Sequence, residues 1–179
     1  MTFAQRCVLA LLVGTVVACG SSESMPPYPY AVPKGRDDRT VQVEIVGAMN
    51  GHVLQAQSPN GVAFVVRLAD VMAPFPRQPW GSNATTALRD LAQGKHALLR
   101  PYEHVLEAGK MTVVGRVYVD GRDLAWEMVG SGNAWVWEAK SKDQKLKELQ
   151  NWAKAKRKGL WSLPEAERIP PWKFLWRET

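Results

Sequence analysis

The stretch that decides the fold is residues 41–68, VQVEIVGAMNGHVLQAQSPNGVAFVVRL. Three runs in it have the alternating, β-branched pattern that is typical of half-buried strands: residues 41–45, 53–57 and 62–68. Asn50-Gly51 and Pro59-Asn60-Gly61 separate these runs, and both are tight-turn signals. The stretch therefore predicts an antiparallel meander of three strands.

Farther along the chain, helical and extended patterns alternate. A helix is expected over residues 84–91, capped by Ser82 or Asn83 and ended by Gly94. The later elements are expected to be extended structure at 96–100, a strand at 112–119 ending in Asp120-Gly121, a helix at 124–129, a strand at 133–137 and a basic helix at 142–158 stopped by Gly159. This order predicts an α+β fold, a small closed β-barrel that carries helices.

The first residues have the pattern of an export signal. Arg6 precedes an apolar run at 8–17, and small residues lead directly to Cys19. This end resembles the bacterial lipobox, which implies acylation of Cys19 and a membrane anchor without a spanning helix. The alternative is a buried N-terminal helix with an incidental cysteine, which the following Gly20-Ser21-Ser22 disfavours. We expect a signal peptide at 1–18, a Pro-rich tether at 19–39, and a location on the periplasmic face of the outer membrane.

Composition limits the remaining classes of protein. Of the 179 residues 46% are apolar and 22% charged, which suits one packed domain, and the 14 Gly and 12 Pro are too few for a fibrous chain. The only long apolar stretch, residues 8–18, is shorter than the ~20 residues of a membrane-spanning helix, which excludes a polytopic membrane protein. The domain is expected at 40–163 as a monomer, followed by an aromatic extension at 164–179. This extension either packs back on the barrel or offers a docking edge, and the stiff Pro170-Pro171 favours the first. The 23 basic against 17 acidic side chains are compatible with a polyanionic partner, but also with simple solubility.

Several stretches, taken together, resemble the staphylococcal nuclease (thermonuclease-like) family. They are VRLA at 66–69, AP at 73–74, VGRVYVDGR at 114–122, GNAWV at 132–136, GLW at 159–161 and PPWKF at 170–174. The resemblance covers about residues 40–174. It implies a five-stranded OB-type barrel with three α-helices.

The same resemblance implies a degenerate active site. The family cleaves phosphodiesters with carboxylate-bound calcium, a glutamate that activates water, and two arginines that neutralise the phosphate. Of these positions only Arg67 is kept, because the second arginine is matched by Thr112. His52 and Met72 stand where the calcium carboxylates are expected, and Phe75 stands in place of the glutamate. The resemblance thus implies neither a bound metal nor another cofactor.

Other side chains are candidates for binding. Arg67, Arg100 and Arg116 come from three predicted strands and could converge on an anion, or each could be solvated or ion-paired separately. Trp135 and Trp137 could stack on bases, although core packing is expected for at least one of them.

Two hypotheses about function remain open. The first is a lipid-anchored binding module for a protein, a nucleic acid or another polyanion, with its catalytic site lost. The alternative is a divergent phosphodiesterase that uses Arg67 with relocated groups such as Asp70, His52 or Glu103.

Overall fold

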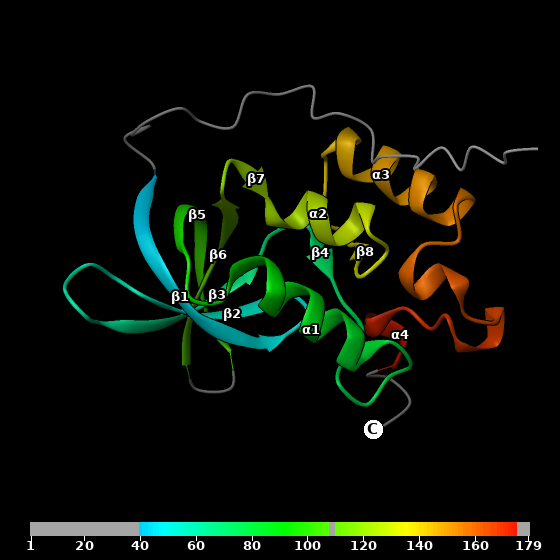
Figure 1. Cartoon of the computed structure of the whole chain (residues 1–179), viewed down its shortest axis with the longest axis horizontal. Coiled ribbons are helices and arrows are strands. Elements are labelled where there is room, and N and C mark those ends of the chain that lie inside the picture. The colour runs from blue at the N-terminus through cyan, green and yellow to red at the C-terminus, as the bar shows by residue number, and fades with distance from the viewer. Residues whose placement is uncertain (1–39, 108–109, 175–179) are drawn as a thin grey trace, which may run out of the picture.

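The computed structural model describes residues 40–107 and 110–174, so the predicted signal peptide and tether lie outside the described residues (Figure 1). Five strands form the barrel: β1 (Val41–Asn50), β2 (Val53–Gln57), β3 (Ala63–Leu68), β5 (His96–Glu107) and β6 (Lys110–Val119). They follow the order β3-β2-β1-β5-β6, and a parallel pairing of β3 with β6 closes the ring. This confirms the predicted OB-type barrel and its α+β class.

The meander forms as the alternation predicted. Asn50 lies opposite Val53 in the first hairpin, and Gln57 lies opposite Ala63 in the second. The predicted turn at Asp120-Gly121 also forms, with both residues at positive φ, and leads into the short strand β7 (Arg122–Asp123). The turn signals therefore fixed the register of three hairpins.

Strand β5 is longer than the predicted 96–100. It continues through a β-bulge between Pro101 and Glu103 and pairs with β6 as far as Glu107. The polar run from Tyr102 to His104 hides this continuation, because all three residues are exposed and show no alternation.

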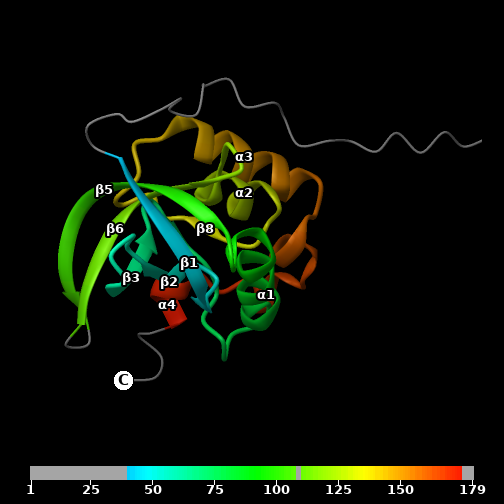
Figure 2. The ribbon, with the colours of Figure 1, turned by 60° about the vertical axis from the view of Figure 1, so that its left-hand side comes forward.

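The described residues form four α-helices, of which the first two pack against the barrel: α1 (Gly81–Ala92), α2 (Leu124–Gly130), α3 (Gln144–Ala155) and α4 (Pro171–Phe174). Figure 2 shows α1 alongside β1, and α2 alongside α3. Two short 3-10 helices, Gly159–Ser162 and Glu165–Glu167, connect α3 to α4. The one-turn helix α4 was not among the three expected. No helix in the described part of the chain has the length and apolar character to cross a membrane.

The expected cap of α1 at Ser82 or Asn83 is wrong. The helix begins at Gly81, after Trp80 in a left-handed conformation (φ 72°) and without a side-chain cap. The preceding turn supplies the entry instead, since the side chain of Gln78 accepts from the N–H of Phe75 and its carbonyl accepts from Gly81. A Cβ at position 81 would lie 1.9 Å from the carbonyl oxygen of Phe75, so this turn requires glycine.

Helix α3 is also shorter than the predicted 142–158. Asp143 caps it by accepting from the N–H groups of Lys145 and Leu146. It ends at Ala155, because Arg157 and Gly159 both adopt positive φ and turn the chain away.

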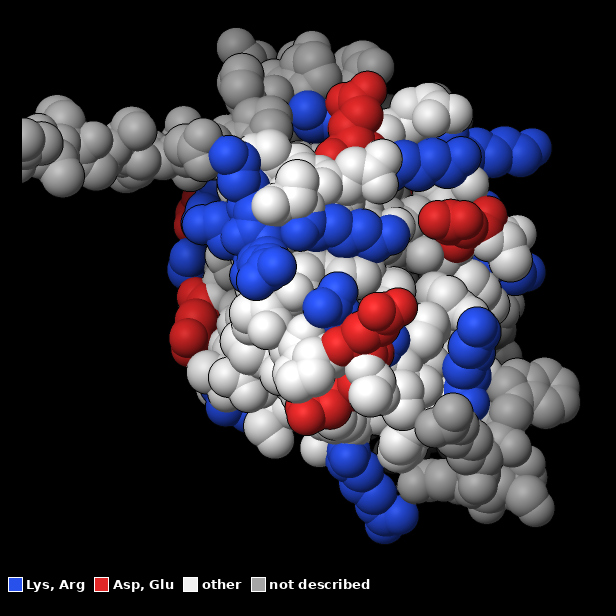
Figure 3. Space-filling model, turned by 90° about the vertical axis from the view of Figure 1, so that its right-hand side faces the viewer, with Lys and Arg blue, Asp and Glu red and all other residues white. Residues whose placement is uncertain are grey.

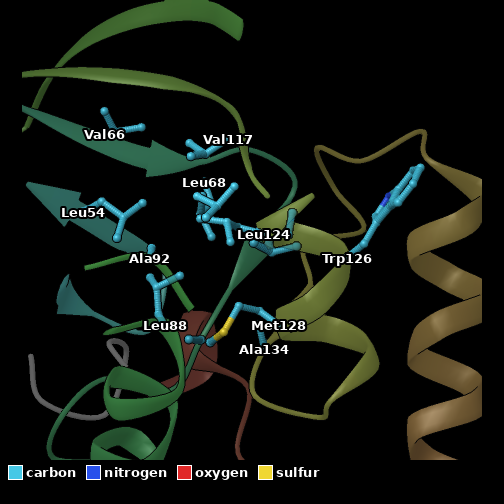
Figure 4. Close-up of a cluster of buried hydrophobic side chains, with 14 of the residues drawn as sticks. Leu54, Val66, Leu68, Leu88, Ala92, Val117, Leu124, Trp126, Met128 and Ala134 are labelled. Atoms are coloured by element: carbon cyan, nitrogen blue, oxygen red, sulfur yellow. The ribbon is translucent and has the colours of Figure 1, made fainter. Parts of the chain in front are cut away.

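The core lies between the barrel, α1 and α2 (Figure 4). Its largest fully buried side chains include Ile45, Leu54, Leu68, Leu88, Leu124 and Met128. Strand β4 (Val71–Met72) pairs with β8 (Trp135–Val136) outside the barrel. This short ladder holds the segment that follows Arg67 next to the segment that precedes Trp137.

Candidate functional site

A cavity of about 240 Å³ opens on the outer face of the barrel where β3, β5 and β6 lie side by side. We call it the strand pocket; its polar and aromatic lining consists of Arg67, Asp70, Tyr102, Glu103, Trp137 and Lys140. Alternation along β3 explains the position of Arg67, because its neighbours Val66 and Leu68 are fully buried in the core. In the register, Val114 of β6 lies between Arg67 of β3 and Glu103 of β5.

Two cations gather on one indole in this pocket. The guanidinium carbon of Arg67 lies 5.7 Å from the ring centroid of Trp137, and Nζ of Lys140 lies 5.9 Å from it. Both distances suit cation–π attraction. The backbone N–H of Trp137 donates to the carbonyl of Asp70 at 2.8 Å, which ties this residue to the end of the barrel strand.

The opposite wall carries Tyr102, whose side chain is a second aromatic surface open to solvent. The residue is 55% exposed, and partial burial of its hydroxyl raises the pKa above the usual value for tyrosine. The pocket therefore has two aromatic walls, two cations, and two carboxylates, those of Asp70 and Glu103.

Arg116 is held inside the protein rather than in the pocket. It is only 5% exposed; its Nε donates to Asp123 at 2.7 Å and its Nη1 to Asp143 at 2.8 Å. Asp70 lies 3.6 Å from the same Nη1, and the ring of Trp126 stacks against the guanidinium at 5.2 Å. Burial raises the pKa of Asp70, an effect that the charge of Arg116 opposes. The charge of Arg116 is thus taken up by carboxylates of its own chain.

The side chain of His52 is buried and does not line the strand pocket. It is 3% exposed, its Nδ1 accepts from the N–H of Ala73 at 3.2 Å, and its ring meets that of Phe75 edge-on at 5.9 Å. Burial, with a smaller contribution from the charge of Arg67, lowers the pKa of His52 from 6.5 to about 4. The imidazole is therefore neutral at pH 7, with one ring nitrogen free of a proton, and the bond from Ala73 assigns Nδ1 as that acceptor.

The residues at the family's metal positions do not fit calcium. Calcium takes six to eight oxygen ligands, whereas His52, Met72 and Phe75 offer no carboxylate oxygen. Across residues 40–107 and 110–174, no group of three or more His, Cys, Asp or Glu is arranged to hold a metal ion. At the position of the second arginine, Thr112 is 3% exposed and pairs with Val65.

The structure brings together part of the set predicted from sequence. Arg67 and Trp137 meet in the strand pocket, together with Asp70 and Glu103 from the alternative hypothesis, whereas His52 does not line it. Arg100 lies opposite Arg116 on β5 but is not part of the pocket lining. Of the two alternatives for these arginines, convergence of all three on one anion is not observed, and Arg116 is ion-paired separately with Asp123 and Asp143.

Two lining residues were missed by sequence reasoning. Tyr102 is the bulged residue of β5, and Lys140 lies in a turn where its own N–H and that of Ser141 donate to the carbonyl of Trp137. An aromatic residue inside a polar run and a lysine three positions after a tryptophan were the signals available. Trp135, although two residues from Trp137, packs edge-on against Trp161 at 4.3 Å and lines a different cavity.

Comparison with known proteins gives a consistent result. The profile of the family described as "Staphylococcal nuclease homologue" matches residues 65–163. A protein of Escherichia coli O157:H7 named "Uncharacterized endonuclease" is 32% identical over 134 residues, 74% of this chain and 82% of that protein. "Staphylococcal-like nuclease CAN1" of Arabidopsis thaliana is 30% identical over 116 residues, 65% of this chain and 34% of that protein. "Protein ParB" of Escherichia coli is 32% identical over 120 residues, 61% of this chain and 65% of that protein.

Proposed function

We propose that this chain, which belongs to the staphylococcal nuclease family, binds single-stranded nucleic acid without the calcium-dependent cleavage that the family resemblance implies. The observation that carries the proposal is the convergence of Arg67 and Lys140 on the ring of Trp137 at the strand pocket. A cation beside an exposed aromatic face is the combination that single-stranded nucleic acid requires, since the cation contacts phosphate and the ring stacks on a base.

The rest of the lining supports a nucleotide rather than a bare anion. Tyr102 supplies a second aromatic surface across the pocket. The carboxylates of Asp70 and Glu103 are acceptors for the exocyclic amino group of a base such as cytosine. A simple phosphate or sulfate ion would be repelled by these two carboxylates, whereas a base uses them.

Loss of cleavage is supported by the groups that replace the family's acids. Met72 and Phe75 are apolar and supply neither oxygen ligands nor a proton acceptor for water. His52 supplies no oxygen ligand either, and as a base for water it is blocked, because it is only 3% exposed and its Nδ1 already accepts from the N–H of Ala73. Removal of a general base alone slows such reactions by about 10²–10⁴-fold, before the loss of the metal is counted.

The test is binding of labelled oligodeoxycytidylate of eight nucleotides to the purified protein, followed by fluorescence anisotropy. Trp137→Ala is expected to weaken the affinity by about 5- to 150-fold, the range measured for one stacked base. Affinity should also fall steeply with salt, because phosphate contacts release counterions. The matched control is Arg122→Ala, an exposed arginine outside the pocket, which is expected to bind as the wild type does. Absence of binding at low salt, or equal binding by Trp137→Ala, would refute the proposal.

A second candidate is a divergent phosphodiesterase. It is favoured by the position of Arg67, Asp70 and Glu103 around one pocket, and by the names of the endonuclease relatives. The same oligonucleotide incubated with calcium, with a transition metal and with chelator separates the two functions. Shortened products that disappear in Arg67→Ala and Asp70→Asn would establish the enzyme and end the proposal of lost cleavage.

We further propose, from the sequence alone, that acylated Cys19 anchors the protein as a monomer on the periplasmic face of the outer membrane. Metabolic labelling with palmitate, followed by membrane fractionation and gel filtration of the detergent-extracted protein, tests this. Cys19→Ser is expected to lose both the label and the membrane association.

A further inference from the structure

A second cavity, of about 390 Å³, lies between β8, α3 and α4. We call it the tryptophan pocket; its side chains with aromatic or polar groups are Trp135, Trp137, Glu138, Gln150, Lys154 and Trp172. We propose that this cavity is a second base-stacking subsite, which takes the next nucleotides of a single strand whose first base occupies the strand pocket. The inference rests on the proposed function and names a binding surface beyond it.

The two cavities share one residue, because Trp137 lines both the strand pocket and the tryptophan pocket. Trp135 precedes it by two residues in an extended segment, where alternate side chains project to the same side about 6.6 Å apart. A chain of bases that passes Trp137 therefore meets a further indole at a spacing comparable to one nucleotide step of an extended strand.

The walls of the tryptophan pocket are held in place before any ligand arrives. Trp135 packs edge-on against the buried Trp161 at 4.3 Å and against Trp172 at 6.1 Å. Between the two strand tryptophans, the N–H of Val136 donates to the side chain of buried Gln150 at 2.9 Å, which fixes the strand to α3. Fixed aromatic rings lose little conformational entropy on binding, which favours stacking over the alternative of a collapsed cavity.

Positive charge accompanies the aromatic surface. Lys154 lines the pocket, and its Nζ lies 4.8 Å from the ring of Trp161. Exposed basic residues continue from it past the end of α3, at positions 154, 156, 157 and 158. Figure 3 shows Lys and Arg side chains gathered in a band across this side of the molecule. A backbone of phosphates leaving the strand pocket would find a cation in each cavity, Lys140 in the strand pocket and Lys154 in the tryptophan pocket.

The experiment compares deoxycytidine 5′-monophosphate with oligodeoxycytidylate of eight nucleotides on the purified protein. The mononucleotide fills the strand pocket alone, so the wild type should bind the octanucleotide at least 10-fold more tightly. Trp172→Ala and Lys154→Ala are each expected to weaken octanucleotide binding by about 5-fold or more, and to leave mononucleotide binding unchanged. Trp152→Ala is the matched control, because this tryptophan lies on the same helix but does not line the pocket. Lys154 is exposed, so its variant keeps the test valid if loss of Trp172 disturbs α4.

The outcomes separate the subsite from the proposed function. If neither ligand binds, the proposed function fails and the subsite fails with it. If the mononucleotide binds but the octanucleotide gains nothing, or if both variants bind the octanucleotide as the wild type does, the subsite alone is refuted. A peptide copied from residues 24–34, which are rich in Pro and Tyr, is titrated in parallel. Should Trp172→Ala abolish binding of the peptide and not of the octanucleotide, the pocket serves peptide docking and the inference is overturned.

Discussion

Arg116 donates from Nε to the carboxylate of Asp123 at 2.7 Å, in a place where the two residues are 5% and 1% exposed. Asp123 also accepts from the N–H groups of Ala125 and Trp126 and so caps α2. This pair connects strand β6 to the helix that follows it.

Arg116→Met is expected to reduce the free energy of unfolding by about 3–5 kcal/mol, because it leaves a buried carboxylate without its counter-charge. Urea unfolding at pH 7 measures the change. Arg122→Met is the control: its partner Glu127 lies 3.8 Å away and its side chain is 43% exposed, so a loss below about 1 kcal/mol is expected. Equal losses in the two variants would contradict the assignment of Arg116 as a buried structural cation.

The pKa of His52 makes stability depend on pH. In the unfolded chain its pKa is near 6.5, and in the folded protein burial lowers it to about 4. The unfolded state therefore binds a proton first as the pH falls, so the free energy of unfolding is unaffected above pH 6.5 and decreases between pH 6.5 and 4. Between pH 7.5 and 5 this single group should cost about 2 kcal/mol.

His52→Asn isolates that effect, because an amide oxygen can accept from Ala73 as Nδ1 does but does not titrate. The variant should be less stable than the wild type at pH 7.5 through lost packing against Phe75, with a flatter dependence on pH. Parallel curves for the two proteins over this range would show that His52 is not buried in its neutral form.

The segment around Gly132 and the segment around Gly159 cross closely, and substitution of Gly132 tests this contact. Both have positive φ, and a Cβ on either would lie 2.2 Å from a carbonyl oxygen of the opposite segment. Gly132→Ala should therefore destabilise the protein by more than the 1–2 kcal/mol of a left-handed alanine alone. Gly121→Ala provides that reference value, since its φ is 73° and no atom lies within 4 Å of the added carbon. Thermal unfolding of the two variants should give clearly different midpoints.

Calcium titration tests whether His52, Met72 and Phe75, at the positions that the resemblance assigns to the metal site, still bind the ion. Titration calorimetry of the purified protein with calcium chloride is expected to give no saturable heat, with or without oligonucleotide, because His52, Met72 and Phe75 supply no carboxylate. The combined variant His52→Asp, Met72→Asp, Phe75→Glu restores three acids and is expected to take up the ion if it folds. Stoichiometric micromolar uptake by the unaltered chain would contradict the assignment.

The barrel was predictable because its signals are local. Alternation along β1 to β3 and the turn residues Asn50-Gly51 and Asp120-Gly121 each act within a few residues, and the structure confirms them. Strands β4 and β7, of two residues each, were too short to show a period. The start of α1 was mistaken because its entry depends on a hydrogen-bonded turn at Phe75 and Gln78 rather than on a capping side chain.

The candidate site was predictable only in part, since it is assembled from distant segments. Arg67 followed from its motif, but nothing local connects it with Tyr102 or Lys140. The position of Arg116 depends on Asp123 and Asp143, which lie on either side of α2 and meet only when α3 docks. Sequence patterns identify residue types, whereas the pairing of charges is decided by packing.

The parallel pairing of β3 with β6 also has a consequence for how the molecule is made. During synthesis, which proceeds from the N-terminus, β1 to β3 are made first. The outer edge of β3 then has no strand partner for its peptide groups until β6 has been made, after α1 and β5. No nascent fragment that stops before β6 can complete the ring. Folding is consequently governed by the late, long-range pairing of β3 with β6, and a growing chain can aggregate through the open edge of β3 until that pairing forms.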